Sequence, residues 1–181
     1  MKIGIIVGSV RQGRKAEQVG EWVAAAVAAR DGVEATLLDI AAFDLPILMA
    51  PTPPENANKK YDDPLVTAWS QAIDAQDGYV FVTPEYNHSV PGALKNAYDL
   101  LGSEWSGKTV AFVGYGATGA IRSVEHWRQI TAIFDMVGTV QQVGLGLHTD
   151  FAPDGGFTPV DRRTGELAAT IDALVALTAR R

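Results

Sequence analysis

The pattern of apolar and polar residues changes repeatedly along the chain between two periods. Short β-branched runs that are apolar on both sides of their alternation recur, beginning with KIGIIVG at Lys2–Gly8. Such runs are typical of strands that are buried on both faces of a parallel sheet. We therefore expect five strands, at Lys2–Gly8, Val33–Ile40, Tyr79–Thr83, Thr109–Val113 and Val140–Leu147.

The segments between these runs have helical periodicity. Val19, Trp22, Val23, Ala26 and Val27 recur at the spacing of one helix face and predict a helix over Lys15–Arg30. Prolines that can start helices and a threonine that can cap one predict four more, over Pro64–Ala75, Pro91–Leu101, Ile121–Val137 and from Thr164 onward. The proline-rich segment Asp44–Asn58 is predicted to be a loop that covers another part of the protein.

Five strands that alternate with five helices predict an α/β protein, with a parallel sheet between two layers of helices. Right-handed connections leave two strand orders, Rossmann-like and flavodoxin-like, and both bind ligands beyond the carboxyl ends of the strands. The loops after the first and third strands carry the most polar side chains. Because the flavodoxin-like order 2-1-3-4-5 places these two strands side by side, we favour that order. The length of 181 residues predicts a single domain over 1–181.

Composition and charge narrow the classes of function. The chain is 47% hydrophobic and 20% charged, as in a soluble globular protein, and its formal net charge is −6. An acidic chain lacks the positive surface that nonspecific nucleic-acid or anionic-membrane binding requires. No apolar run approaches the ~20 residues of a membrane-spanning helix. The absence of cysteine excludes disulfides and thiolate metal sites, and it favours a cytoplasmic location.

The loop after the first strand has the features of a phosphate site. It leads from a strand into a helix N-terminus, where free N–H groups attract anions, and it carries Ser9, Arg11, Arg14 and Lys15. The segment lacks the Lys-Ser/Thr pair of a P-loop, so no magnesium-binding hydroxyl follows the second glycine.

Two further loops carry candidate ligand groups. The loop after the third strand, Thr83–Gly92, is rich in hydrogen-bonding side chains, and a G-x-G-x-x-G segment follows the fourth strand at Gly114–Gly119. A dinucleotide fingerprint would follow the first strand and would be matched by an acidic residue at the end of the next. We therefore interpret these glycines as permitting close approach to a flat ligand, with a Rossmann-type NAD enzyme as an alternative.

These three loops together resemble a known family. The residues that carry the resemblance are Ser9-x-Arg11, the segment Pro84-Glu85-Tyr86-Asn87 with Ser89, Pro91, Gly92, Leu94, Lys95 and Asn96 downstream, and a glycine loop followed by Arg122. They are similar to the NAD(P)H-dependent FMN reductases, which include quinone, azo-dye and chromate reductases. The resemblance spans roughly Lys2 to Leu147.

The resemblance implies a flavodoxin-like fold that binds FMN non-covalently. Ser9 and Arg11 would hold the phosphate, helped by backbone N–H groups near Arg14 and Lys15. The residues that would border the isoalloxazine ring are Pro84, Glu85, Tyr86 and Asn87 with Ser89 nearby, and Tyr115 and Gly116 at its other edge. NAD(P)H would pass hydride to the flavin, and a quinone, azo dye, nitroaromatic, flavin or metal oxyanion would take the electrons. We expect no catalytic side chain, because the flavin carries the chemistry.

Several expectations and alternatives remain open from the sequence. The main alternative function is a flavodoxin-type electron carrier without NAD(P)H chemistry. The three histidines, His88, His126 and His148, lack metal-ligand spacing, so no metal site is expected. Trp105 lies in a polar turn and is expected to be exposed and to pack at the interface of a homodimer or a dimer of dimers. Arg122 could form a salt bridge on its helix, or could contact the nicotinamide nucleotide or a neighbouring subunit.

Overall fold

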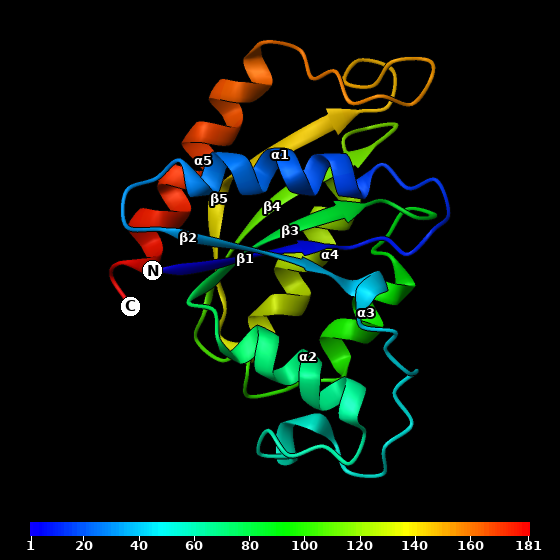
Figure 1. The fold of residues 1–181 in the computed structure, drawn as a ribbon, viewed down its shortest axis with the longest axis vertical. Helices are drawn as coiled ribbons and strands as arrows, with labels where there is room; N and C mark the ends of the chain where they lie inside the picture. The colour runs from blue at the N-terminus through cyan, green and yellow to red at the C-terminus, as the bar shows by residue number, and fades with distance from the viewer.

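A computed structural model, which describes residues 1–181, places all five strands in one parallel sheet (Figure 1). The strand order is β2-β1-β3-β4-β5. The strands are β1 (Lys2–Val7), β2 (Glu34–Asp39), β3 (Gly78–Pro84), β4 (Thr109–Gly116) and β5 (Val137–Gly146). This order confirms the flavodoxin-like prediction. Because every strand runs in the same direction, the loops that follow them meet at one edge of the sheet.

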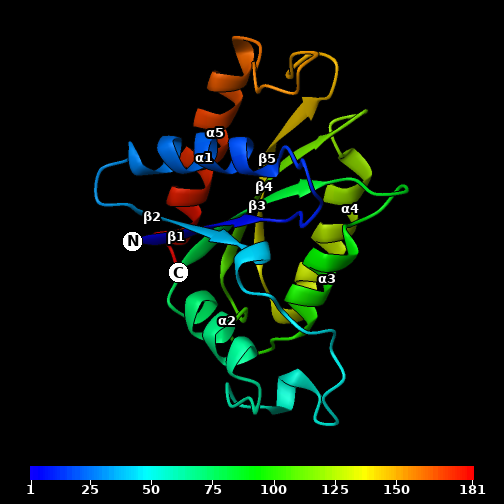
Figure 2. The same cartoon turned by 45° about the vertical axis from the view of Figure 1, so that its right-hand side comes forward.

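Helices cover both faces of the sheet, as Figure 2 shows. The helices α1 (Ala16–Ala28) and α5 (Arg162–Thr178) lie on one face, and α2 (Pro64–Asp74), α3 (Gly92–Asp99) and α4 (Ile121–Thr131) lie on the other. None of these helices combines the length and the apolar character needed to cross a bilayer.

The sheet separates two apolar clusters, and alternate residues of each strand belong to different ones. In β3, Val80 and Val82 pack toward α1 and α5, whereas Tyr79 and Phe81 pack toward the other three helices. This is the two-residue period of a strand with both faces buried, which is why the apolar runs are uninterrupted in the sequence.

Trp105 corrects one expectation from the sequence. Its side chain is only 1% exposed, and its ring stacks on Tyr98 with ring centroids 4.8 Å apart. The indole N–H donates to the carbonyl of Tyr98. Trp105 therefore belongs to the core beneath α2, α3 and α4, and it cannot serve as an exposed contact between subunits.

Several element boundaries also differ from the sequence-based prediction, among them those of the last two helices. The helix expected over 121–137 ends at Thr131, followed by one 3-10 turn, and Asp135 adopts a left-handed backbone conformation before β5 begins at Val137. The last helix begins at Arg162, so Thr164 lies within its first turn rather than capping it.

The proline-rich segment between β2 and α2 packs over the cluster beneath α2 and α3. The side chain of Asn96 on α3 accepts a hydrogen bond from the Leu48 N–H and donates one to the Pro46 carbonyl. At the far end of the segment, Tyr61 donates to the buried carboxylate of Glu104. Apart from the 3-10 turns at Ile40–Ala42 and Pro54–Asn56, the segment is a covering loop, as predicted for residues 44–58.

Candidate functional site

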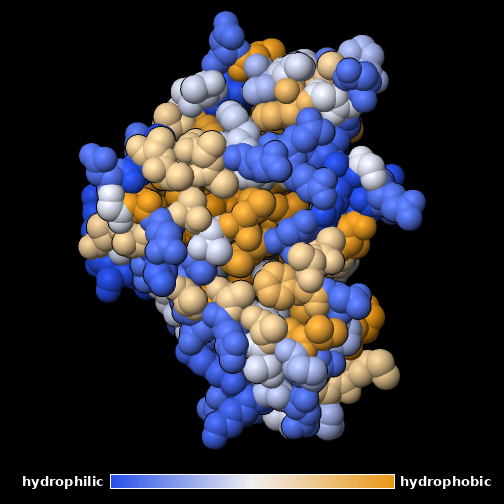
Figure 3. All heavy atoms as spheres, viewed as in Figure 1, coloured by the Kyte–Doolittle hydropathy of each residue, from blue (hydrophilic) through white to orange (hydrophobic).

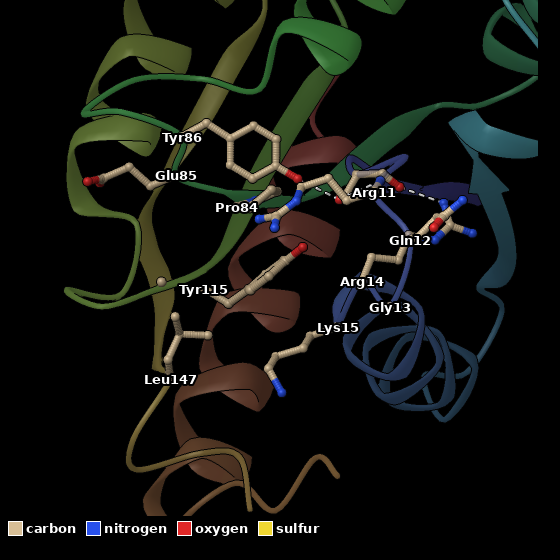
Figure 4. Close-up of a pocket in the computed structure, with 12 residues that line it drawn as sticks. Arg11, Gln12, Gly13, Arg14, Lys15, Pro84, Glu85, Tyr86, Tyr115 and Leu147 are labelled. Atoms are coloured by element: carbon tan, nitrogen blue, oxygen red, sulfur yellow. Dashed lines mark hydrogen bonds between the residues drawn. The ribbon is translucent and has the colours of Figure 1, made fainter. Parts of the chain in front are cut away.

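A hollow of about 260 Å³ opens at the carboxyl edge of the sheet, where the loops after β1, β3, β4 and β5 meet (Figure 4). Nine of the eleven residues that the sequence singled out line it: Ser9, Arg11, Arg14, Lys15, Pro84, Glu85, Tyr86, Tyr115 and Gly116. Asn87 and Ser89 lie outside the lining. The structure thus gathers residues from three separate loops into one place.

The first loop presents a row of unused backbone donors. The N–H groups of Gln12, Gly13, Arg14 and Lys15 have no acceptor within the chain, and α1 begins at the next residue, Ala16. No side chain caps this helix, because Lys15 occupies the N-cap position. Uncapped N–H groups at a helix start bind anions well, since they point outward along the positive end of the helix dipole.

Arg14 has a structural set of partners. Its guanidinium donates to the carbonyl of Ser9 and to the carboxylate of Asp39 at the end of β2, and it also pairs with Glu17 on α1. Burial would lower the pKa of Arg14, but these two carboxylates raise it above its ordinary value. The side chain therefore fixes the shape of the loop, which leaves its backbone N–H as the group that faces the hollow.

Arg11 and Lys15 hold the remaining positive charge of the loop. Arg11 is exposed, forms no ion pair, and lies with its guanidinium 5.6 Å from the centre of the Tyr86 ring. Lys15 donates to the carbonyl of Gly155 and lies 4.7 Å from the centre of the Phe151 ring. Neither cation has a carboxylate partner, so both remain available to an anionic ligand.

Two tyrosines flank the hollow, and Figure 4 shows both hydroxyl groups directed toward the first loop. The hydroxyl of Ser9 lies 2.7 Å from that of Tyr86. Burial raises the pKa of Tyr115, so its phenol stays protonated. The rings of Tyr86 and Tyr115 supply the flat walls that an aromatic ligand needs.

Glu85 lines the hollow, but its carboxylate is directed away from Tyr86 toward α4 (Figure 4). It accepts hydrogen bonds from the guanidinium of Arg122 and from the backbone N–H groups of Arg122 and Ser123. Burial alone would raise the pKa of Glu85, but these donors outweigh it and lower the pKa. Of the roles considered for Arg122, the structure shows a salt bridge, but its partner Glu85 follows β3 and does not lie on the same helix.

The two predicted residues outside the hollow belong to a tight turn. Tyr86 and Ser89 exchange backbone hydrogen bonds, and Asn87 and His88 between them both have positive φ angles. Asn87 is exposed at the tip of this turn, and the Ser89 hydroxyl is hydrogen-bonded to His126 on α4. The turn thus orients Tyr86, while Asn87 and Ser89 stay clear of the hollow.

The glycines of the third loop have separate roles. A Cβ on Gly114 would lie 2.7 Å from the carbonyl oxygen of Gly119, and Gly119 itself packs against Gly144 of β5. These two glycines let β4, β5 and the loop pack closely. Only Gly116 lines this hollow. The interpretation that the glycines permit close approach to a flat ligand is therefore wrong for Gly114 and Gly119 at this hollow.

Two lining residues, Gln12 and Leu147, had no role predicted from the sequence, whereas Gly13 is one of the two glycines that allow close backbone approach in the first loop. Gly13 has a φ of +65° and an open Cβ position, which suits a loop that curls around an anion. Leu147 carries no local signal, since it follows an ordinary apolar strand. Its backbone N–H donates to the carbonyl of Gly116, and this bond brings its side chain to the hollow.

The residues present fit FMN. Uncapped backbone N–H groups, the Ser9 hydroxyl and Arg11 match a phosphate monoester. Tyr86 and Tyr115, beside Pro84 and Gly116, match a flat ring system. The side chains around the hollow form no group of three or more metal ligands.

Comparisons with known proteins agree with this geometry. A family model described as NADPH-dependent FMN reductase matches residues 1–150. The chain belongs to this family. Membership confirms the predictions of an oxidoreductase that uses FMN, with NAD(P)H as its co-substrate.

Individual relatives of this chain are named as FMN or quinone reductases. The chain is 40% identical over 126 residues to the NAD(P)H-dependent FMN reductase ntnL of Nectria sp, covering 67% of this chain and 63% of that protein. It is 34% identical over 137 residues to a quinone reductase of Pseudomonas putida, covering 66% of this chain and 67% of the relative. The chain thus spans less than two thirds of the ntnL protein.

A solved structure shows the same architecture. The chain superposes on FerB, a flavoenzyme NAD(P)H:(acceptor) oxidoreductase of Paracoccus denitrificans, with a TM-score of 0.74 and 26% identity. The match covers 99% of this chain and 97% of FerB. The sheet order and helix layers described above are therefore those of a known flavoenzyme fold.

Proposed function

We propose that this protein is an FMN-dependent NAD(P)H oxidoreductase that reduces a small, electron-accepting molecule. The observation that carries the proposal is the hollow at the sheet edge, where unpaired phosphate-type donors and two tyrosine rings lie together. Bound FMN would supply the redox chemistry, by accepting hydride from NAD(P)H and passing electrons onward.

The residues of the chain would bind and orient the cofactor. The Ser9 hydroxyl, the Arg11 guanidinium and the N–H groups of residues 12–15 would hold the phosphate. Tyr86 and Tyr115 would flank the isoalloxazine ring. Arg14 would keep the first loop in shape through Asp39, and Glu85 would hold the third-strand loop against α4.

For the acceptor we propose a quinone as the first class to test. The support is the quinone reductase of Pseudomonas putida among the relatives. Azo dyes, nitroaromatics, free flavin and metal oxyanions remain further candidates, since reduced flavin donates electrons to each of them.

We also propose a cytoplasmic location and a homodimer or dimer of dimers. The absence of cysteine favours the location. For assembly, the support is apolar exposure on the segment between β2 and α2, where Ile47 is 71% and Met49 86% exposed. Figure 3 shows apolar atoms along that segment, at the lower right of the visible face. Sedimentation velocity would test the assembly directly, and a monomer would contradict it.

The absorbance of the purified protein reconstituted with FMN, followed without oxygen as NADPH or NADH is added, tests the proposed reaction. Rapid bleaching of a protein-bound flavin spectrum is the expected result. Bound flavin that stays oxidised with both coenzymes would instead favour an electron carrier. Flavin that separates from the protein on gel filtration would overturn the phosphate-site assignment.

A further inference from the structure

A second hollow, of about 330 Å³, lies beside the first at the same edge of the sheet. Its walls come from the loop between β4 and α4, the end of β5 and the first turn of α5. Nothing in the proposed FMN contacts uses it. The lining side chains with polar or charged groups are Thr118, His148, Thr149, Arg162 and Arg163.

The two hollows share a boundary made of two backbone segments. Gly116 lines the first hollow and Ala117 the second, while Leu147 lines the first and His148 the second. The hydrogen bond from the Leu147 N–H to the Gly116 carbonyl joins these segments. A ligand that lies over the first hollow needs to cross only this narrow ridge to reach the second.

The charge that the second hollow presents to solvent is positive. The Arg162 side chain is 68% exposed and forms only a long ion pair, 3.8 Å, with Glu166 one turn further along α5, which Arg163 also binds. The side chain of His148 is also exposed and forms no hydrogen bond with the chain. Arg163, by contrast, is buried and already paired with Asp150 and Glu166.

The carboxylates near this hollow are largely withdrawn from it. Asp150 is fully buried, where it accepts hydrogen bonds from Arg163, Thr149 and the Gly146 N–H. Glu85 is only 8% exposed and is held by Arg122, whose guanidinium also donates to the Thr118 hydroxyl of the hollow. A ligand that enters therefore meets arginine and histidine side chains and two threonine hydroxyls, in an otherwise acidic protein.

We propose that this second hollow binds the 2′-phosphate of NADPH, with Arg162 and His148 as the residues that select NADPH over NADH. The proposal rests on the proposed function, since the nicotinamide end must lie over the first hollow. A phosphate monoester is a dianion with several acceptor oxygens, and it suits an exposed guanidinium beside an imidazole and hydroxyl groups. NADH carries only a 2′-hydroxyl there and gains no such charge-assisted bonds.

The first test measures coenzyme selectivity in the FMN-reconstituted protein. Arg162→Ala should lower the ratio of kcat/KM for NADPH to that for NADH about tenfold, as expected when one exposed charge-assisted contact is removed. Arg162→Lys should retain most of the ratio, because it keeps the charge. Arg180→Ala is the matched control, since it removes an exposed arginine at the end of the chain and should keep the wild-type ratio.

The second test needs no turnover. Calorimetric titration of the FMN-loaded protein with adenosine 2′,5′-bisphosphate should show tighter binding than with adenosine 5′-monophosphate or inorganic phosphate, and the difference should disappear in Arg162→Ala. Equal affinity for the three probes, or selectivity that survives Arg162→Ala, would overturn the proposal. Inorganic phosphate that binds as well as the bisphosphate would show a general anion site and would overturn it too.

Failure of the 2′-phosphate site can be distinguished from failure of the proposed function. If flavin does not stay bound, or is reduced by neither coenzyme, the proposed function fails. If flavin is bound and reduced with a ratio that Arg162→Ala leaves unchanged, the proposed function stands and the 2′-phosphate site is wrong.

Discussion

The hydroxyl oxygens of Ser9 and Tyr86 lie 2.7 Å apart and join two loops that are 77 positions apart in the sequence. Ser9 is the proposed phosphate ligand, and Tyr86 is a proposed wall for the flavin ring. Since a serine hydroxyl has one proton and two lone pairs, Ser9 can accept a hydrogen bond from the tyrosine and donate its own proton to a phosphate at the same time. The same hydrogen bond thus orders the site and leaves the Ser9 proton for the ligand.

Changes on the two sides of this bond should act in the same direction. Ser9→Ala removes the proposed phosphate donor and should weaken FMN binding. Tyr86→Phe keeps the ring but removes the phenol that orients Ser9, so it should weaken FMN binding by up to about fivefold, the equivalent of one neutral hydrogen bond of ~1 kcal/mol. Quenching of flavin fluorescence on titration measures both, and tighter binding in Tyr86→Phe would show that the tyrosine instead takes the Ser9 proton from the ligand.

Arg11→Ala should weaken FMN binding at least about tenfold, because a hydrogen bond to a charged group contributes about 1.5–3 kcal/mol. Arg11 has no carboxylate partner, so its removal should leave the free energy of unfolding nearly unchanged. Arg180→Ala provides the control for loss of one positive charge. An unchanged dissociation constant for FMN in Arg11→Ala would remove Arg11 from the phosphate site.

Glu85→Gln should destabilise the fold by about 2 kcal/mol, because it removes the charge of a buried carboxylate paired with the half-exposed Arg122 and weakens a side-chain acceptor for the first N–H groups of α4. For a chain of this size the midpoint of thermal unfolding should fall by about 4–8 °C. Glu125→Gln is a matched control on the same helix, since Glu125 is 62% exposed and 4.0 Å from Arg128. Equal midpoints for the two variants would contradict the role assigned to Glu85.

Trp105→Ala should lower the free energy of unfolding by about 3–5 kcal/mol, which is the usual cost of truncating a buried tryptophan. Urea unfolding measures the loss. The milder Trp105→Phe should fold and should sediment like the wild-type protein at equal concentration. A change of sedimentation coefficient with unchanged stability would restore an interface role for this residue.

Asp150 should make the stability depend on pH in the acid range. Burial would raise its pKa, but hydrogen bonds from Arg163 and the Gly146 N–H outweigh this, so the folded-state pKa lies below the ordinary value of 3.8. The unfolded state then binds more protons, and stability falls as the pH drops below 3.8 through the folded-state pKa. Urea unfolding at neutral and acid pH should show that Asp150→Asn destabilises the protein most at neutral pH. A difference that stays constant with pH would contradict this linkage.

The strand order and the location of the site could be predicted because their causes are local. Strands such as β3 are apolar on both faces, with Val80 on one and Phe81 on the other, and this pattern is visible without any tertiary contact. The loops after β1 and β3 were also recognisable, since arginines and hydrogen-bonding residues follow directly after apolar strands. A parallel sheet then requires those loops to meet.

Other features depend on partners that are far apart in the sequence. The turn around Trp105 is polar, and only packing against Tyr98 and α2 shows that the indole is buried. The position of Arg14 in the first loop predicts a phosphate ligand, but its guanidinium forms a salt bridge with Asp39, 25 positions later. Leu147 reaches the hollow only through its backbone bond to Gly116. No periodicity encodes these pairings, because each depends on how two separate elements are placed.

The contacts between the first loop and residues 155–157 constrain the order in which the site can form. Lys15 donates to the Gly155 carbonyl, and the side chain of Gln18 accepts a hydrogen bond from the Phe157 N–H. Both partners lie beyond the stretch that the family shares at 1–150. During synthesis, β1 and α1 leave the ribosome before residues 155–157, so Lys15 acquires its contact only after a partner 140 positions later has been made. The nascent protein should therefore become able to retain flavin late, after α5 has packed beside α1.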